Sequence, residues 1–224
     1  MTADGSPISP YAWRTRFALE RLGLDFAGVG LSFTDIRQVF SGRFTTVPIL
    51  EDGAAVVGDS WSIADYLDAQ HGPGALFGSP GERAMVRFFD RWCARNITPA
   101  LFQICVIDIH DRLGAQDRVY FRESREERLG KPLEETLATR EGQRAQLRLA
   151  LQLIRDVLKE SAFIGGEAAN YADFIGWGLF IWAGSVSSVP LLEPGDPLLD
   201  WLRRGIASQR RADLHLPGLG ISAR

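Results

Sequence analysis

Two short apolar runs lie close together in the first third of the chain. The first ends at Ile49 and Leu50, Glu-Asp-Gly follows, and Val56 and Val57 form the second. An Asp-Gly pair between two such runs is typical of a β-hairpin. A segment with the apolar spacing of a helix then follows, over residues 60–71. The pattern predicts a strand–turn–strand–helix unit.

A second helical pattern occupies residues 11–22, directly after Ser9 and Pro10. Serine is a favoured N-cap residue, and proline is favoured at the first position of a helix. Apolar side chains fall on two opposite faces of this helix, which predicts burial between a sheet and a second domain. Residues 26–33 are predicted to form a short strand, and residues 34–40 a brief helix.

The order of these elements is the thioredoxin-like α/β pattern without its first strand. Residues 1–8 have almost no strand character, because polar residues, Gly5 and Pro7 fill most of the segment. We therefore expect the central parallel strand to be missing or truncated. The chain is expected to start late, through a mis-assigned start or a real loss, which would expose the interior of the sheet.

The remainder of the chain has helical patterns. A linker rich in glycine and proline covers residues 72–81. Residues 170–173, Asn-Tyr-Ala-Asp, have the pattern of a capping box. Residues 174–182 are apolar on almost all sides, which predicts a buried central helix. The predicted fold is a thioredoxin-like α/β domain over residues 1–75 and an all-α domain over residues 82–224.

Composition narrows the class of protein. The net charge of −3 is too small to indicate binding to nucleic acid or to an anionic membrane surface. No apolar stretch is long enough to span a membrane, and the N-terminus lacks the apolar core of a signal peptide. Cys93 and Cys105 are predicted to be buried thiols in a reducing cytoplasm. His71, His110 and His215 are scattered and predicted to lie at the surface, so we expect no metal site.

The hairpin region contains the candidate chemistry. Pro48 stands where the first strand should begin, and a proline in such a place often follows a cis peptide bond in a tight bend. That bend would leave the backbone of Val47 free to pair with an extended peptide. Asp59 and Ser60 offer a carboxylate, a hydroxyl and the N–H groups of a helix start, which suit a ligand with an ammonium and a carboxylate. The alternative is an ordinary hairpin followed by a well-capped helix.

Taken together, these features resemble the glutathione S-transferase family over nearly the whole chain. The run Asp59-Ser60-Trp61, where the family usually has Glu-Ser, resembles the bacterial β-aryl-etherase and fungal etherase-like branch. The missing first strand is a departure from the family pattern. The motifs that carry the resemblance are Ser9-Pro10-Tyr11-Ala12-Trp13-Arg14, Thr46-Val47-Pro48, Asp59-Ser60 and residues 170–173.

The resemblance implies that glutathione is the co-substrate and that a serine hydroxyl stabilises its thiolate. Ser9, at the start of the first helix, is the implied donor, with Ser6 as a rival and plain N-capping as the alternative role of Ser9. Thioredoxins and glutaredoxins have cysteines where Ser9 and Ala12 stand, so dithiol exchange at this position is excluded.

The resemblance also implies how the tripeptide is held. Val47, next to Pro48, would pair with the cysteinyl part, and Asp59 and Ser60 would hold the γ-glutamyl end. Arg43 would meet the glycine carboxylate, unless it is simply a solvent-facing loop residue. For the hydrophobic co-substrate we nominate five aromatic residues, each of which could instead belong to the core. They are Tyr11, Trp13, Phe89, Trp92 and Trp182.

Three functions fit this sequence. The first is an enzyme in which the glutathione thiolate attacks an electrophilic carbon, by conjugation or by cleavage of a β-aryl ether. The second is a protein of the same fold that binds apolar ligands without turnover, as the missing strand suggests. The third is a glutathione-dependent isomerase. The resemblance further implies a homodimer in which the first domain of one chain meets the helical domain of the other.

Overall fold

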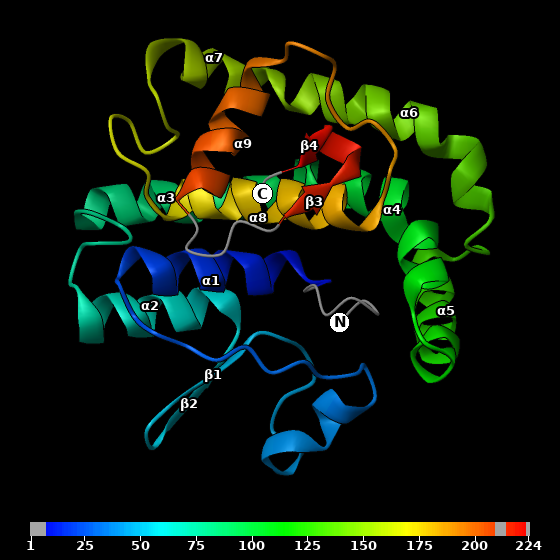
Figure 1. Cartoon of the computed structure of the whole chain (residues 1–224), viewed down its shortest axis with the longest axis horizontal. Coiled ribbons are helices and arrows are strands. Elements are labelled where there is room, and N and C mark those ends of the chain that lie inside the picture. The colour runs from blue at the N-terminus through cyan, green and yellow to red at the C-terminus, as the bar shows by residue number, and fades with distance from the viewer. Residues whose placement is uncertain (1–7, 209–213, 223–224) are drawn as a thin grey trace.

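The computed structural model describes residues 8–208 and 214–222, and the remaining residues lie outside the described part (Figure 1). A small α/β domain comes first and an all-helical domain follows. Helix α1 (Pro10–Arg21) lies between α2 (Ser60–His71) and α8 (Tyr171–Val186). The other helices are α3 (Pro80–Asn96), α4 (Thr98–Arg112), α5 (Ala115–Leu129), α6 (Glu135–Ala150), α7 (Gln152–Glu160) and α9 (Pro197–Ala207).

The predicted hairpin is confirmed. Strands β1 (Ile49–Asp52) and β2 (Ala55–Gly58) pair antiparallel, with Ile49 opposite Gly58 and Asp52 opposite Ala55. Gly53 in the turn has a φ of +58°, a conformation that glycine adopts at little cost. A second small pair, β3 (His215–Leu216) and β4 (Ile221–Ser222), lies near the C-terminus against α8.

The strand predicted over residues 26–33 is wrong. That segment is irregular, and within the described residues β1 and β2 pair only with each other, so it has no neighbouring strand. Its end is held instead by α5, because the N–H of Phe33 donates to Oδ1 of Asp117 at 2.8 Å. A backbone donor satisfied by a side chain does not need a β-ladder. The expectation of a missing first strand falls on residues 1–7, outside the described part of the chain, and on Ile8, which is not in a strand.

The segment after residue 33 also differs from its prediction. Two short 3-10 turns, η1 (Asp35–Arg37) and η2 (Val39–Gly42), stand in place of one brief helix. Phe40 and Ser41 have φ values of +50° and +56°, so a regular right-handed helix cannot continue through them.

Burial of α1 on two sides is confirmed, although its neighbour on the first-domain side is helix α2. Phe17 contacts Phe174 and Trp177 of α8, with ring centroids 5.8 and 5.2 Å apart. Gly178 allows the two helices to approach closely, since a Cβ there would lie 2.7 Å from the carbonyl oxygen of Pro10. Helix α1 therefore connects the α/β domain to the core of the helical domain.

The central helix of the all-α domain forms as predicted. Residues 171–184 of α8 are all buried, and Asn170 and Asp173 form the expected capping box. Pro99 stands in the first turn of α4, just after α3 ends, so the helical pattern is interrupted at this point. Among the described residues, no helix is long and apolar enough to cross a membrane, and no group of three or more potential metal ligands occurs.

Two predictions about single side chains have different outcomes. Cys93 and Cys105 are buried free thiols, as expected, and burial raises the pKa of both. His110 is buried rather than at the surface, because its position on α4 faces the core, and its Nδ1 lies 2.9 Å from Asp111 Oδ1.

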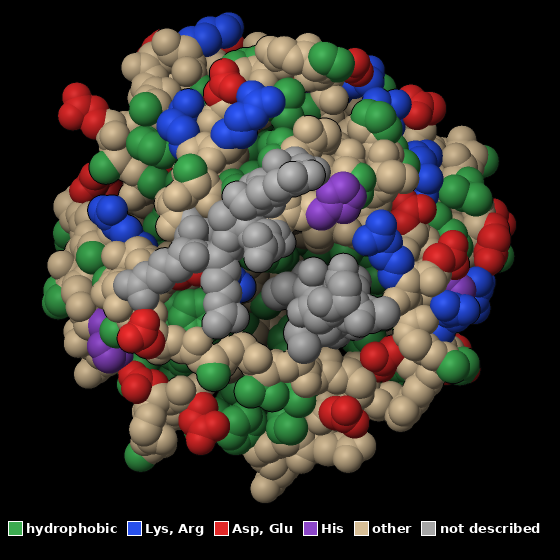
Figure 2. All heavy atoms as spheres, in the orientation of Figure 1, with side chains coloured by type: hydrophobic (Ala, Val, Ile, Leu, Met, Phe, Trp, Pro, Cys, Tyr) green, Lys and Arg blue, Asp and Glu red, His purple; other side chains and the backbone are tan. Residues whose placement is uncertain are grey.

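On the face shown in Figure 2, basic and acidic side chains are interspersed among apolar ones.

Candidate active site

Ser9 is the N-cap residue of α1. Its extended backbone (φ −127°, ψ 123°) ends the preceding segment, and its Oγ accepts from the N–H of Ala12 at 3.4 Å. The hydroxyl hydrogen of Ser9 has no acceptor within the described residues. The positive end of the α1 dipole lies at the same point. Ser9 can therefore donate to an anion placed before the helix while its oxygen caps the first turn.

Val47 and Pro48 precede β1. The Val47–Pro48 peptide bond is cis, which agrees with the prediction from the sequence. Pro48 is buried and Val47 is half-buried. The ladder with β2 begins only at Ile49, and within the described residues the backbone of Val47 makes no hydrogen bond. The peptide groups of Val47 are thus available to an extended ligand.

Asp59 and Ser60 begin α2. Oδ1 of Asp59 accepts from the N–H groups of Trp61 and Ser62, at 3.1 and 3.0 Å, and from the hydroxyl of Ser62 at 3.3 Å. All of these bonds use Oδ1, so Oδ2 remains for a cationic group of a ligand. Asp59 has a φ of +70°, which is unfavourable for a residue with a Cβ. Tertiary contacts must hold this turn in place.

The backbone before Asp59 comes close to an aromatic ring. A Cβ on Gly58 would lie 2.5 Å from the ring of Phe44, so any other residue at this position would force the ring to move. The guanidinium of Arg43 lies 5.0 Å from the centroid of the same ring. Arg43 is exposed and forms no ion pair within the described residues. It is therefore free to meet a carboxylate near the hairpin.

The five aromatic residues nominated for a hydrophobic co-substrate do not form one site. Tyr11, two residues after Ser9, is 39% exposed. Trp13 and Trp182 are only 2% and 4% exposed, so both belong to the core and offer no surface to a co-substrate. Helical spacing alone could not distinguish these two faces, because α1 and α8 are apolar on more than one side.

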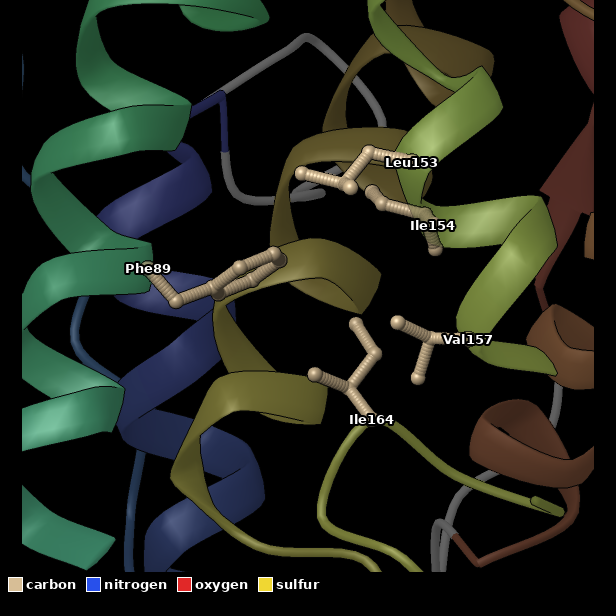
Figure 3. Close-up of a pocket in the computed structure, with 5 residues that line it drawn as sticks. All are labelled: Phe89, Leu153, Ile154, Val157 and Ile164. Carbon is tan, nitrogen blue, oxygen red and sulfur yellow. The ribbon is translucent and has the colours of Figure 1, made fainter. Parts of the chain in front are cut away.

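Phe89 and Trp92 lie on α3 with their rings stacked 5.7 Å apart. Phe89 lines a small apolar pocket of about 70 Å³ together with residues of α7 and of the loop after it (Figure 3). The residues that line it come from α3, α7 and the following loop, none of which carries Ser9 or Asp59. The other residues that line it are Leu153, Ile154, Val157 and Ile164.

Sequence reasoning missed two buried contacts between elements of the two domains. Arg14 of α1 is buried and donates to Asp90 of α3 at 2.7 Å. Tyr171 of α8 donates from its hydroxyl to the carbonyl of Ser60 at 2.7 Å. For the contact between Arg14 and Asp90, the only local signal was the place of Arg14 on a helix that is apolar on two faces. No local signal indicates the second, since its partners are 111 positions apart.

Comparisons with known proteins show the family to which the chain is similar. Residues 5–78 match the glutathione S-transferase N-terminal domain, and residues 84–189 match the glutathione S-transferase C-terminal domain. Glutathione S-transferase 4 of Zea mays is 32% identical over 108 residues, which span 46% of this chain and 48% of the maize protein. The chain thus aligns with about half the length of this curated relative.

Solved structures of similar fold cover nearly the whole chain. Glutathione transferase GSTFuA3 from Phanerochaete chrysosporium is 25% identical, with a TM-score of 0.81 over 92% of this chain and 94% of its own. A glutathione S-transferase of Ceriporiopsis subvermispora, solved in complex with glutathione, is 22% identical, with a TM-score of 0.79 over 93% and 95%. With the N- and C-terminal domains matched one after the other, the chain belongs to the glutathione S-transferase family.

Proposed function

We propose that this protein is a glutathione transferase in which the Ser9 hydroxyl stabilises the glutathione thiolate. One observation carries this: Ser9 caps α1 with its oxygen while its hydrogen has no acceptor in the described part of the chain. A free donor at the positive end of a helix favours an anion there. The relative of known structure solved with glutathione supports the choice of ligand.

The chemistry that Ser9 supplies is a shift of an acid–base equilibrium. A free thiol has a pKa of about 8.5, so it is mostly protonated at neutral pH. A hydrogen bond to sulfur and the helix dipole both favour the charged form and lower the pKa. Lowering it by about two units corresponds to roughly 2.7 kcal/mol.

The tripeptide is held by the segment around the hairpin. Val47 pairs through its free peptide groups with the cysteinyl part of glutathione. Asp59 binds the γ-glutamyl ammonium through Oδ2, and Ser60 meets the γ-glutamyl carboxylate at the start of α2. Arg43 binds the glycine carboxylate. In this arrangement each charged group of glutathione meets a group of opposite charge or the N-terminal end of a helix dipole.

The reaction proceeds by attack of the thiolate on an electrophilic carbon. A C–S bond forms, and the leaving group departs with the electrons of the bond that breaks. In β-aryl ether cleavage the broken bond is C–O, and the aryl oxide then takes up the proton that the thiol lost. Asp59-Ser60-Trp61 supports this etherase reaction. Tyr11, close to Ser9 and partly exposed, is the nominated aromatic residue best placed to contact the electrophile.

The second copy of a homodimer would cover an apolar surface on the helical domain. This α3–α7 surface consists of Met85, Phe88, Leu153 and Val157, of which Phe88 is 62% and Leu153 is 54% exposed. Helices α3 and α7 both contribute residues to the pocket of Figure 3, and exposed apolar side chains beside such a pocket indicate a protein interface. We expect the first domain of the partner to lie against it. Light scattering of the wild type and of Phe88→Glu tests this: a dimer that the substitution dissociates is expected, and an unchanged dimer contradicts this surface.

Retention on glutathione-agarose, combined with turnover assays, tests the function. The assays use a chloronitrobenzene for conjugation and an aryl-ether compound for cleavage. We expect retention and turnover of at least one of the two substrates. Retention with neither reaction would favour the ligand-binding alternative, which the two-stranded sheet of the described first domain supports. Turnover of an isomerisation substrate alone would favour the isomerase. Failure to bind glutathione would contradict both glutathione-dependent reactions and would favour a degenerate scaffold of the same fold.

A further inference from the structure

A buried hydrogen bond joins the helical domain to the Asp59–Ser60 turn. The hydroxyl of Tyr171, in the first turn of α8, donates to the carbonyl of Ser60, in the first turn of α2, at 2.7 Å. Both residues are buried, Tyr171 completely. The two first turns therefore lie side by side, and a fixed donor from one domain meets an acceptor from the other.

Several contacts fix Tyr171 itself. Its N–H donates to the carbonyl of Leu76 at 2.8 Å. Its ring lies against Trp61 and Phe77, with ring centroids 5.9 and 5.2 Å apart. The capping box of α8 holds its backbone, because Asn170 and Asp173 flank it. A side chain held in this way presents its hydroxyl in one position, so the bond to Ser60 constrains the α2 turn rather than the tyrosine.

The hydroxyl acts as a donor. Burial raises the pKa of Tyr171, so its phenol stays protonated. The buried ion pair of Arg14 with Asp90 and the carboxylate of Asp59 are the charged groups whose fields reach it. The Ser60 carbonyl accepts this hydrogen bond. If the two groups moved apart, a buried hydroxyl and a buried carbonyl would each lose a partner, which costs free energy.

The α2 turn needs such a constraint. Asp59 precedes Ser60 with a φ of +70°, a conformation that a residue with a Cβ keeps only when its surroundings hold it. The carboxylate of Asp59 holds the turn from the solvent side through Trp61 and Ser62. The hydroxyl of Tyr171 holds it from the protein interior.

We propose that Tyr171 is a positioning residue for the glutathione site, which keeps Asp59 and Ser60 oriented toward the γ-glutamyl end of the ligand. This inference rests on the proposed function. Tyr171 is not a catalytic residue, since its hydroxyl is buried and engaged with Ser60. Because the γ-glutamyl end lies away from the sulfur, loss of the hydroxyl weakens glutathione binding and leaves the chemical step intact.

The test compares the wild type with Tyr171→Phe, which removes only the hydroxyl. We expect KM for glutathione to rise about five- to tenfold, the effect of losing one hydrogen bond, while kcat changes less than about twofold. In the absence of glutathione, amide hydrogen exchange over residues 59–64 should become faster in Tyr171→Phe. Circular dichroism of both proteins establishes that the fold is kept.

Tyr66→Phe is the matched control. Tyr66 lies on α2, the helix that begins at Ser60, and its hydroxyl donates to Asp52 at 3.0 Å near the surface. This variant also loses one tyrosine hydroxyl, but the bond that is lost, to Asp52, lies away from the Asp59–Ser60 turn. We expect KM for glutathione and exchange over residues 59–64 to stay at their wild-type values.

Three results would overturn the proposal. The first is an unchanged KM for glutathione in Tyr171→Phe. The second is an equal rise in KM for Tyr66→Phe, and the third is a fall in kcat as large as the rise in KM. If the wild type neither binds nor turns over glutathione, the proposed function is wrong whatever Tyr171 does.

In that case hydrogen exchange alone tests the role of Tyr171. Faster exchange over residues 59–64 in Tyr171→Phe than in the wild type supports the positioning role, and unchanged exchange refutes it.

Discussion

Gly178 of α8 and Pro10 of α1 lie so close that a Cβ on Gly178 would come within 2.7 Å of the Pro10 carbonyl oxygen. The same Cβ would lie 3.2 Å from the backbone nitrogen of Arg14. Both neighbours are backbone atoms of a buried helix, so they cannot rotate away. Since Ser9 caps the same helix, the glycine of α8 helps to set where the candidate donor stands.

Gly178→Ala should therefore destabilise the protein. Overpacking at such a contact costs about 1–3 kcal/mol, which outweighs the higher helix propensity of alanine. Gly142→Ala is the control, because Gly142 lies in α6 with nothing within 4 Å of its added Cβ. It should stabilise by about 0.5–1 kcal/mol. Urea unfolding of both variants measures the difference, and equal stability would contradict the close approach of α1 and α8.

Ser9→Ala should lower kcat/KM by about one to two orders of magnitude, because the bound thiol loses a hydrogen bond to its charged form. The pH dependence of the reaction tests this reason, because it reports the pKa of the bound thiol. With glutathione saturating, the pKa on which kcat/KM for the electrophile depends should move up toward that of a free thiol, about 8.5.

Ser6→Ala is the comparison for this experiment, since Ser6 is the rival donor and lies outside the described residues. It should leave kcat/KM near the wild-type value. The assignment of Ser9 is wrong if Ser6→Ala abolishes activity and Ser9→Ala does not.

Asp59→Asn separates ligand recognition from helix capping. Asparagine is as good an N-cap as aspartate and tolerates positive φ, so stability should change little. Loss of the negative charge should raise KM for glutathione at least about tenfold. Ser79→Ala, at the N-cap of α3, is the reverse control. It should cost about 1 kcal/mol of stability with no change in KM. A normal KM in Asp59→Asn would exclude Asp59 as the ammonium partner.

Asp173 should be a major determinant of stability. Its carboxylate accepts from the N–H groups of Ile164, Gly165 and Asn170, at 2.8 to 3.1 Å, and from Nε1 of Trp201 at 2.8 Å. Asp173→Ala leaves these donors buried without an acceptor, which should cost at least about 3 kcal/mol. Asn170→Ala removes only the N-cap and should cost about 1 kcal/mol. Chemical denaturation of the two variants tests this order.

The ion pair between Arg122 and Glu134 should contribute to stability only above acid pH. The hydrogen bond from Arg122 lowers the pKa of Glu134 to about 2, from an ordinary value of 4.5. A depressed acid pKa stabilises the folded state above pH 4.5, and this contribution disappears as pH falls toward 2.

Glu134→Gln tests this pH dependence. The difference in unfolding midpoint between wild type and variant should be largest near pH 6 and smaller at pH 3. Glu127→Gln, on α5 and without an ion pair within the described residues, should show no such trend. A pH-independent difference for Glu134→Gln would show that the pair is not formed.

The sequence was sufficient for features that depend on a few neighbouring residues. The Asp-Gly turn predicted the hairpin, and Ser9 and Asn170 predicted the starts of α1 and α8, because turns and caps are decided within about four positions. Local spacing failed for residues 26–33, since a strand exists only where another strand can pair with it.

The tertiary structure decided which side chains face the core and which distant groups meet. Trp13 and Trp182 have the same aromatic character as Tyr11, yet packing between α1 and α8 buries the first two and leaves Tyr11 partly exposed. The bond from Tyr171 to Ser60 depends on two helix starts that come together only when both domains are folded. The sequence by itself therefore determined the elements and the candidate donor, while contacts between residues far apart in the chain decided the surroundings of the site.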